Sequence, residues 1–476
     1  MPSQLEQPQT EGSADPSEES SIVAVGTGQH AVAEVTSALT EGSHTHTLTA
    51  AQPVPGERIA WTIGSRFWAL NLSHIIIDVY PIFFASLMLV FKERLGLTAW
   101  QMVAIFATGP IVSGLPQVFF AWVTDRLDSR ICGWFGLSLG AMCICSIGYA
   151  SNFWVLWGLQ IAGMLGTGMY HPIGAALAGQ IGGAIKPPGT GGRAWGVGMF
   201  YTAGMVGGFL GSLLCTRMTA AFGPQSLLLL AVPGLFMAAA LYSATSRFPH
   251  RHVNHHELHN SIAPDESRER RFAVGLLFVG NVMRFTVNTG LPVLFVIWAE
   301  RRLPTDVASA TNLNGNLLAA LAVGMGIFGL TARRWSPVGR EKGPMLALTL
   351  IGAVIVGATG FAGTSLGEGV MYLMVAASAM GFSAVIPTTI SIAQRLLPGR
   401  TGLASGLMLG TAWSVSAVAP ALAQLFFGGV NLANAPELDP WRIDLAFVGF
   451  ALLLVVSALL TWAIPADLLK RIGHHH

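Results

Sequence analysis

The chain has 476 residues, of which 52% are hydrophobic and only 11% are charged, and its formal net charge is +2. Soluble domains carry roughly 25% charged residues, so this composition excludes a protein whose whole surface meets water and indicates a chain that contacts lipid. The near-neutral net charge says little about partners, and no nucleic-acid partner is expected.

Residues 1–60 differ from the rest of the chain. They are rich in Ser, Thr, Gln, Pro and Gly and show no helical or strand periodicity, which is typical of disordered segments. The segment begins with acidic residues and lacks a basic start followed by an apolar run, so it is not expected to be a signal peptide. We expect a disordered cytoplasmic tail that insertion and activity do not need.

From Phe67 onward, long apolar segments alternate with short charged ones. A helix needs about 20 residues to cross a hydrocarbon core about 30 Å thick. In lipid the backbone must satisfy its own hydrogen bonds, which favours helices. The sequence predicts an all-α polytopic membrane protein with twelve transmembrane helices at 67–91, 100–123, 132–150, 153–181, 194–216, 226–245, 272–298, 309–331, 344–363, 369–393, 402–427 and 443–464.

Basic residues gather in alternate connections between these spans. Cytoplasmic connections carry the excess of Lys and Arg in membrane proteins, so we expect both termini and the long loop after the sixth span to be cytoplasmic. The predicted organisation is a tail at 1–60, a six-helix bundle at 61–246, a linker loop at 247–271, a second six-helix bundle at 272–466 and a C-terminal tail at 467–476.

The two predicted bundles contain similar passages at their fourth and fifth spans. In the first, a Gly-rich segment around His171 leads to the connection 191–193; in the second, the segment 381–394 leads to the connection 397–400. Both connections contain Gly and Arg. Two parallel six-helix repeats of this kind resemble the architecture of the major facilitator superfamily.

Few ionisable side chains remain inside the predicted spans, and two of them share the first span. A charge at the bilayer centre costs on the order of 2.5 kcal/mol or more, so an embedded charge is a candidate functional residue. His74 and Asp78 are four residues apart, which places them on one helical face. A carboxylate beside an imidazole can take up and release a proton. We predict that Asp78 and His74 couple transport to protons; the alternative is a hydrogen bond that orients the helix.

His171 on the fourth span directly precedes Pro172. Proline removes a helical hydrogen bond and tends to kink the helix. A kinked, Gly-rich helix with an imidazole at the break suits a substrate cavity, and a hydrogen-bonded core histidine is the alternative. We predict that His171 and His74 contact the substrate.

Arg284 is the embedded arginine of the seventh span, and it needs a carboxylate, an anion or water because it keeps its charge. Asn281 and Asn288, three residues before it and four after, extend a polar stripe. We predict that these three residues bind substrate. Arg284 is expected to pair with Asp78 in the empty state and to release to an anionic substrate; a permanent structural salt bridge is the alternative.

Charged residues in the connections suggest a gate and no metal site. Asp125, Arg126 and Arg130 lie between the second and third spans, where they can pair with a neighbouring helix end and gate opening; the alternative is a solvated turn. His255 and His259 have helical metal-ligand spacing, but their Pro- and charge-rich context favours a flexible linker. Residues 474–476 are treated as a possible tag. We therefore expect no metal.

Several passages resemble the fosmidomycin-resistance group of the major facilitator superfamily. The stretch 125–130 is also similar to the superfamily's loop signature, although Ala121 and Asp128 stand where glycines are usual. The resemblance covers roughly residues 67–464 and implies a drug or metabolite exporter driven by protons. The passages are His-Ile-Ile-Ile-Asp at 74–78, Tyr-His-Pro-Ile-Gly at 170–174, Arg284 followed by Gly-Leu-Pro at 290–292, and Leu-Leu-Pro-Gly-Arg at 396–400 with Gly-Leu-Ala-Ser-Gly at 402–406.

These observations predict a secondary active transporter that works by alternating access. We expect a proton-coupled exporter of a small anionic or amphiphilic compound. The alternatives are facilitated diffusion or uptake symport of a small metabolite and, more remotely, an integral-membrane enzyme. No enzymatic activity and no cofactor are expected. The expected partners are a small-molecule substrate, protons and the lipid bilayer, for a monomer in a bacterial inner membrane.

Overall fold

A computed structural model describes residues 61–127, 131–186, 192–246, 264–335, 337–365, 367–397, 401–429 and 439–473. These residues belong to one compact unit and form helices and turns, with no strand in any of the described ranges. The predicted tail 1–60, the loop histidines and residues 474–476 lie outside the described residues. The predicted all-α class is therefore confirmed for the part of the chain that the structure describes.

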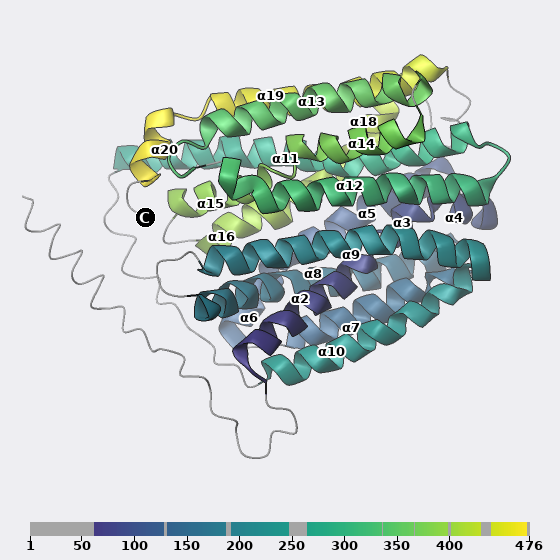
Figure 1. The fold of residues 1–476 in the computed structure, drawn as a ribbon, viewed down its shortest axis with the longest axis horizontal. Coiled ribbons are helices and arrows are strands. Elements are labelled where there is room, and N and C mark those ends of the chain that lie inside the picture. The colour runs from purple at the N-terminus through teal and green to yellow at the C-terminus, as the bar shows by residue number, and fades with distance from the viewer. Residues whose placement is uncertain are drawn as a thin grey trace, which may run out of the picture. The chain divides into compact units, whose positions relative to one another are not determined.

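The first six predicted spans correspond to the helices drawn in purple, blue and teal in Figure 1. They are α2 (Ile63–Val79) with α3 (Phe83–Ser86) and α4 (Met88–Leu95); α5 (Ala99–Gly114) with α6 (Pro116–Leu127); α7 (Ile131–Cys145) with the 3-10 segment η1 (Ser146–Tyr149); α8 (Phe153–Ile185); α9 (Gly192–Phe222); and the 3-10 segment η2 (Pro224–Leu230) with α10 (Ala231–Thr245).

The last six predicted spans correspond to the helices from α11 to α19. They are α11 (Pro264–Arg302); α12 (Val307–Trp335); α13 (Lys342–Ser365); α14 (Glu368–Ser378) with η4 (Ala379–Gly381) and α15 (Ile386–Leu396); α16 (Thr401–Gly406) with η6 (Leu407–Thr411), α17 (Ala412–Val415), η7 (Ser416–Val418) and α18 (Ala419–Phe426); and α19 (Pro440–Trp462). A short helix, α20 (Ala466–Gly473), follows.

Eleven segments of the described residues are long and apolar enough to cross a bilayer, against the twelve predicted. The difference lies at α8, which occupies the predicted fourth span and has 33 residues, enough length to cross. Its glycines, together with Gln160, Tyr170 and His171, lower its mean hydropathy. The twelfth crossing is therefore supported by the length of α8 and not by its composition.

Polar residues fix the start of two helices. Asn152 Oδ1 accepts hydrogen bonds from the backbone N–H groups of Trp154 and Val155 at 3.0 and 3.1 Å, and so caps α8. Asp306 Oδ1 accepts from the backbone N–H of Ser309 at 2.9 Å at the start of α12. Hydrogen bonds from the side chain and backbone of Ser309 lower the pKa of Asp306.

Two crossings of the second bundle are broken along their length. The predicted span 369–393 runs as α14, η4 and α15, with a turn at 382–385. Pro387 lies in the first turn of α15, where a residue without a backbone N–H is tolerated. The predicted span 402–427 contains the π-helical segment η6, a geometry that is frequent at functional sites. Discontinuous helices line the binding sites of many transporters.

The helices up to α10 pack mainly on one another around one apolar core, and those from α11 onward around separate cores. Helices α9 and α12 run side by side and join the two groups (Figure 1). Glycines bring α9 close to α2: a Cβ added at Gly204 would lie 2.3 Å from Asp78 Oδ2, and one at Gly207 would lie 2.3 Å from the Ile75 carbonyl oxygen. This approach encloses the predicted proton site.

Candidate functional site

Three ionisable side chains meet inside the first bundle, and we call them the triad: His74, Asp78 and His171. His74 and Asp78 belong to α2 and His171 to α8. Nε2 of His74 lies 3.2 Å from Asp78 Oδ2, and Nε2 of His171 lies 3.2 Å from Asp78 Oδ1. The structure thus joins the two residues predicted for the proton site to a histidine that was predicted for substrate contact only.

Both imidazole rings use their other nitrogen to bind a backbone carbonyl. Nδ1 of His74 lies 2.6 Å from the Phe200 oxygen, and Nδ1 of His171 lies 2.8 Å from the Thr167 oxygen. A carbonyl oxygen only accepts hydrogen bonds, so this network assigns a hydrogen to each Nδ1. In a neutral ring, Nε2 then presents a bare lone pair to the carboxylate.

This arrangement sets the number of protons that the triad can hold. With Asp78 ionised and both rings neutral, lone pairs face lone pairs at both 3.2 Å contacts. Each contact becomes a hydrogen bond only when a proton lies on it. The triad therefore has a net charge of −1 without such protons, 0 with one and +1 with two. One or two exchangeable protons fit its geometry.

The three side chains differ in how far they are enclosed. The side chain of His74 is 5% exposed, that of Asp78 17% and that of His171 27%. The Phe200 ring stacks on His74 with a centroid distance of 3.6 Å and an interplanar angle of 6°. Tyr170 covers another side of His74, with ring centroids 5.8 Å apart. His171 is therefore the member most open to a substrate or to water.

A glycine on α9 provides a direct test of the triad geometry. A Cβ at Gly204 would lie 2.3 Å from Asp78 Oδ2 and 2.8 Å from His74 Cε1, whereas one at Gly198 would have no atom within 4 Å. Gly204→Ala should therefore displace the carboxylate and reduce transport strongly, while Gly198→Ala on the same helix should behave as wild type. Transport in vesicles with matched protein content measures both. Equal activity of the two variants would contradict the packing described here.

The triad also carries the donor types that metal ions use. Its ligand atoms lie within 4.8 Å of one another. The contacts of 3.2 Å between nitrogen and oxygen are, however, already at the distance of a protonated hydrogen bond, so a proton is the occupant that needs no rearrangement. His255 and His259 lie outside the described residues.

Arg284 lies in the second bundle and not beside the triad. Its side chain is fully buried, at 0% exposure. Nη2 donates to Thr461 Oγ1 of α19 at 2.8 Å, and Nη1 donates to Asn281 Oδ1 at 3.3 Å, while Nε has no partner in the part of the chain that the structure describes. Among the described residues no carboxylate pairs with Arg284, so the predicted Arg284–Asp78 pair is not formed. The spacing of residues along α11 does not indicate which face of this helix packs on α19, and the prediction was therefore wrong about the partner of Arg284.

The two asparagines predicted beside Arg284 are also buried. Asn281 Nδ2 donates to Thr389 Oγ1 of α15 at 2.8 Å and to the Met408 oxygen of η6 at 3.2 Å. Asn288 is 8% exposed. Asn281 thus ties α11 to both broken crossings, a role that the sequence did not indicate because its partners lie more than a hundred residues away.

The residues of the predicted gate fall where the structure describes no side chains. Asp125 and Arg126 lie on α6, but their side chains, and Arg130 entirely, lie outside the described residues. The structure shows instead a charged contact in the second bundle, where Arg395 Nη2 at the end of α15 pairs with the buried Glu341 before α13. Sequence reasoning missed this pair because both residues were assigned to solvated connections.

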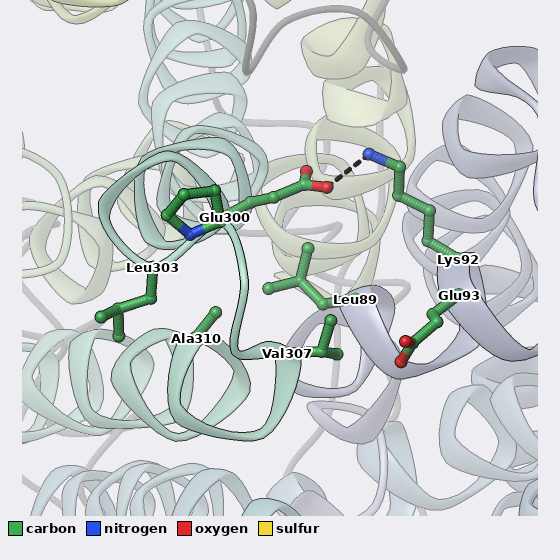
Figure 2. Close-up of a pocket in the computed structure, with 8 residues that line it drawn as sticks. Leu89, Lys92, Glu93, Glu300, Leu303, Val307 and Ala310 are labelled. Atoms are coloured by element: carbon green, nitrogen blue, oxygen red, sulfur yellow. Dashed lines mark hydrogen bonds and ion pairs between the residues drawn. The ribbon is translucent and has the colours of Figure 1, made fainter.

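A second charged contact joins the two bundles at the opposite end. Figure 2 shows Lys92 reaching from α4 to Glu300 near the end of α11, with Nζ 2.6 Å from Oε1. The pair borders a cavity of about 230 Å³ that is also lined by Glu93 and Ala310. Asn314 of α12 adds a link by donating to the Ala85 oxygen at 2.9 Å. These contacts hold the bundles together at this end.

Reversing one charge of the pair should loosen this end. Glu300→Lys places two cations together, so a cysteine introduced at the buried Ala310 should react faster with a polar thiol reagent. The double change Lys92→Glu with Glu300→Lys should restore slow labelling. Glu93→Lys, which changes charge in the same cavity by the same amount, is the matched control and should have little effect. Unchanged labelling in Glu300→Lys would show that the pair does not hold this end closed.

The chain has relatives among curated proteins. An uncharacterized MFS-type transporter, YfnC of Bacillus subtilis, is 23% identical over 428 residues, which is 85% of this chain and 94% of that protein. The fosmidomycin resistance protein of Escherichia coli is 24% identical over 389 residues, or 78% of this chain and 89% of that protein. No family model matches the chain.

Solved structures share the fold. A proton-dependent oligopeptide transporter superposes with a TM-score of 0.61 at 15% identity, over 86% of this chain and 100% of its own. A bacterial homologue of the lysosomal transporter Spinster, inward-facing and occupied, gives 0.59 at 15% identity, over 83% and 95%. The chain is therefore an integral membrane protein with the major facilitator fold, distantly homologous to the secondary transporters of that superfamily rather than to enzymes.

Proposed function

We propose that the chain is a proton-coupled exporter of a small anionic or amphiphilic compound, and that the triad is its proton site. The observation that carries this proposal is the convergence of two Nε2 atoms on one carboxylate at 3.2 Å while both Nδ1 atoms bind carbonyls. Such a site changes its charge with each proton and lies where ionised groups are expensive.

When proton entry drives export, substrate and proton must compete for the same binding site. His171 is the most exposed triad member, and its Nε2 holds a proton only by sharing it with Asp78. A substrate group that donates a hydrogen bond to this Nε2 takes the place of that proton. Binding of substrate from one side and of a proton from the other then alternate at one position, as the two bundles rock about the site.

The structure also supports a second candidate, uptake by symport. A triad with two protons has a charge of +1, and among the described residues the ion-pair partners of Asp78 are the two histidines, while Arg284 bonds to Thr461. A cationic site binds protons and an anion together instead of in competition. The same residues would then carry an anion inward with protons.

The two candidates differ in the direction of flux. In proteoliposomes, an imposed proton gradient should drive an antiported substrate opposite to the protons and a symported one with them. Fosmidomycin, the compound for which the Escherichia coli relative is named, is the first probe, followed by a panel of small anions. Proton-driven accumulation in neither direction for any of them, in correctly inserted protein, would contradict proton coupling.

We further propose that both termini are cytoplasmic, in a bacterial inner membrane, and that Asp125, Arg126 and Arg130 gate the cytoplasmic end. Single cysteines placed in 246–271 and in 430–440 should be labelled from opposite sides of the membrane. Labelling of both positions from the same side would contradict the twelve-helix topology, and labelling of 246–271 from the periplasmic side would contradict this orientation.

A further inference from the structure

We propose that the hydrogen bond between Tyr201 and Ser383 transmits the state of the triad to the broken crossing of the second bundle. Tyr201 is then a positioning residue that couples proton binding to movement of α15. The inference rests on the proposed proton site, and it adds a route from that site to the other bundle.

The first link joins the triad to α9. His74 Nδ1 donates to the Phe200 oxygen at 2.6 Å, and the two rings stack at 3.6 Å. Phe200 has little room to move, because a Cβ at Gly174 of α8 would already lie 2.5 Å from its Cζ. A change in the charge of the His74 ring therefore acts on the peptide that joins Phe200 to Tyr201.

The second link crosses from one bundle to the other. The Tyr201 hydroxyl lies 2.7 Å from Ser383 Oγ, and Ser383 Oγ donates to the Met325 oxygen of α12 at 3.1 Å. A serine hydroxyl has one hydrogen, so Tyr201 is the donor to Ser383. The Tyr201 ring lies against α12, where a Cβ at Gly329 would be 2.4 Å from its Cε1. The contact is thus directional and closely packed.

The position of Ser383 places the Tyr201–Ser383 contact at the turn about which α15 can tilt. Ser383 is fully buried and lies in the turn 382–385 that separates η4 from α15. Because the helix is interrupted there, α15 can tilt without moving α14. The far end of α15 carries Arg395, which pairs with the buried Glu341. Tyr201 therefore holds the pivot of a segment whose other end is part of a charged contact.

Within the described part of the chain, the titratable groups beside this part of α9 are the triad and Tyr170 of α8. The Tyr170 ring stacks on Phe200 with centroids 6.2 Å apart, and its neutral hydroxyl donates to the Leu70 oxygen at 3.2 Å. His74 and Asp78 approach from α2, and His171 approaches from α8. Helix α12 and the turn 382–385 present a carbonyl and a hydroxyl to the Tyr201–Ser383 contact. A change of charge near Tyr201 therefore originates from the triad.

Hydrogen exchange at one pH, on the full chain in detergent, tests the link without a substrate. Asp78→Asn alters the triad, so amide exchange in 382–389 should change by about threefold or more relative to wild type. In the background of Tyr201→Phe, or of Ser383→Ala, the same Asp78→Asn change should have no effect on this segment. Tyr372→Phe, which removes a hydroxyl bonded to Glu368 at 3.2 Å, is the matched control and should leave the Asp78→Asn effect intact.

The outcomes separate this link from the proposed function. Equal exchange of 382–389 in wild type and Asp78→Asn overturns the link even if transport is proton-driven. A response that persists in Tyr201→Phe also overturns it. A response that disappears in Tyr201→Phe supports the link even if vesicles show no proton coupling. If Asp78→Asn does not fold, His171→Gln replaces it as the change to the triad.

Discussion

Asp78→Asn should abolish gradient-driven transport and leave substrate exchange across the membrane measurable. Asparagine has nearly the shape of aspartate, and its amide N–H can donate to one of the two Nε2 atoms, which lie 3.2 Å from the carboxylate oxygens. It cannot take up or release a proton near neutral pH. Loading and release of substrate can therefore continue while the link to the proton gradient is lost.

The measurement compares two modes in the same vesicles. Accumulation under an imposed proton gradient should fall to the level of protein-free vesicles, while counterflow without a gradient should persist. Asp444→Asn is the matched control, because Asp444 is another buried carboxylate, on α19 and outside the triad. Gradient-driven accumulation at the wild-type rate in Asp78→Asn would rule out Asp78 as the coupling group and leave the histidines.

The sequence predicted local relations of the triad well. His74 and Asp78 are four residues apart on one helix, and helical geometry alone brings them together. The structure has them in contact at 3.2 Å. His171 could be predicted only as an embedded imidazole, because nothing in a single sequence states which helix α8 crosses or at what height.

Relations between distant segments account for the other differences. Two charged pairs, Lys92 with Glu300 and Glu341 with Arg395, fall outside the predicted spans, in the connections. The structure instead joins each pair across two helices. Tyr201 gave no signal at all, since one tyrosine in a Gly-rich apolar helix is ordinary. Its importance depends on Ser383, 182 residues away.

Arg284 illustrates a limit of a different kind. The sequence correctly predicts a buried arginine with polar neighbours at helical spacing. We expected Arg284 to pair with Asp78, the embedded residue of opposite charge, because an isolated buried charge is costly. In the structure Arg284 donates to Thr461 and Asn281 instead, inside one bundle. Neutral hydrogen-bond acceptors thus took the place of the expected carboxylate.

Arg284→Gln should make the protein more stable and weaken its binding of anions. A buried cation without a counter-ion carries an effective desolvation penalty of several kcal/mol, and the two hydrogen bonds of Arg284 to neutral groups offset only part of it. Glutamine removes the charge and can still reach Thr461 or Asn281. The free energy of unfolding should rise by about 1 kcal/mol or more, measured by denaturant unfolding in detergent.

The same variant separates a binding role from a structural one. If Arg284 attracts an anionic substrate, the rise in melting temperature that the transported anion produces in wild type should disappear in Arg284→Gln. Arg284→Lys should recover it only in part, because an ammonium group lacks the planar fork that reaches two partners.

Asn288→Ala, one turn away, should reduce the ligand shift without adding stability, because no buried charge is removed. Loss of stability in Arg284→Gln with an unchanged ligand shift would mean that Arg284 only fastens α11 to α19. Higher stability together with a lost ligand shift would instead show a trade-off between stability and function at Arg284. Such a trade-off is common at functional sites.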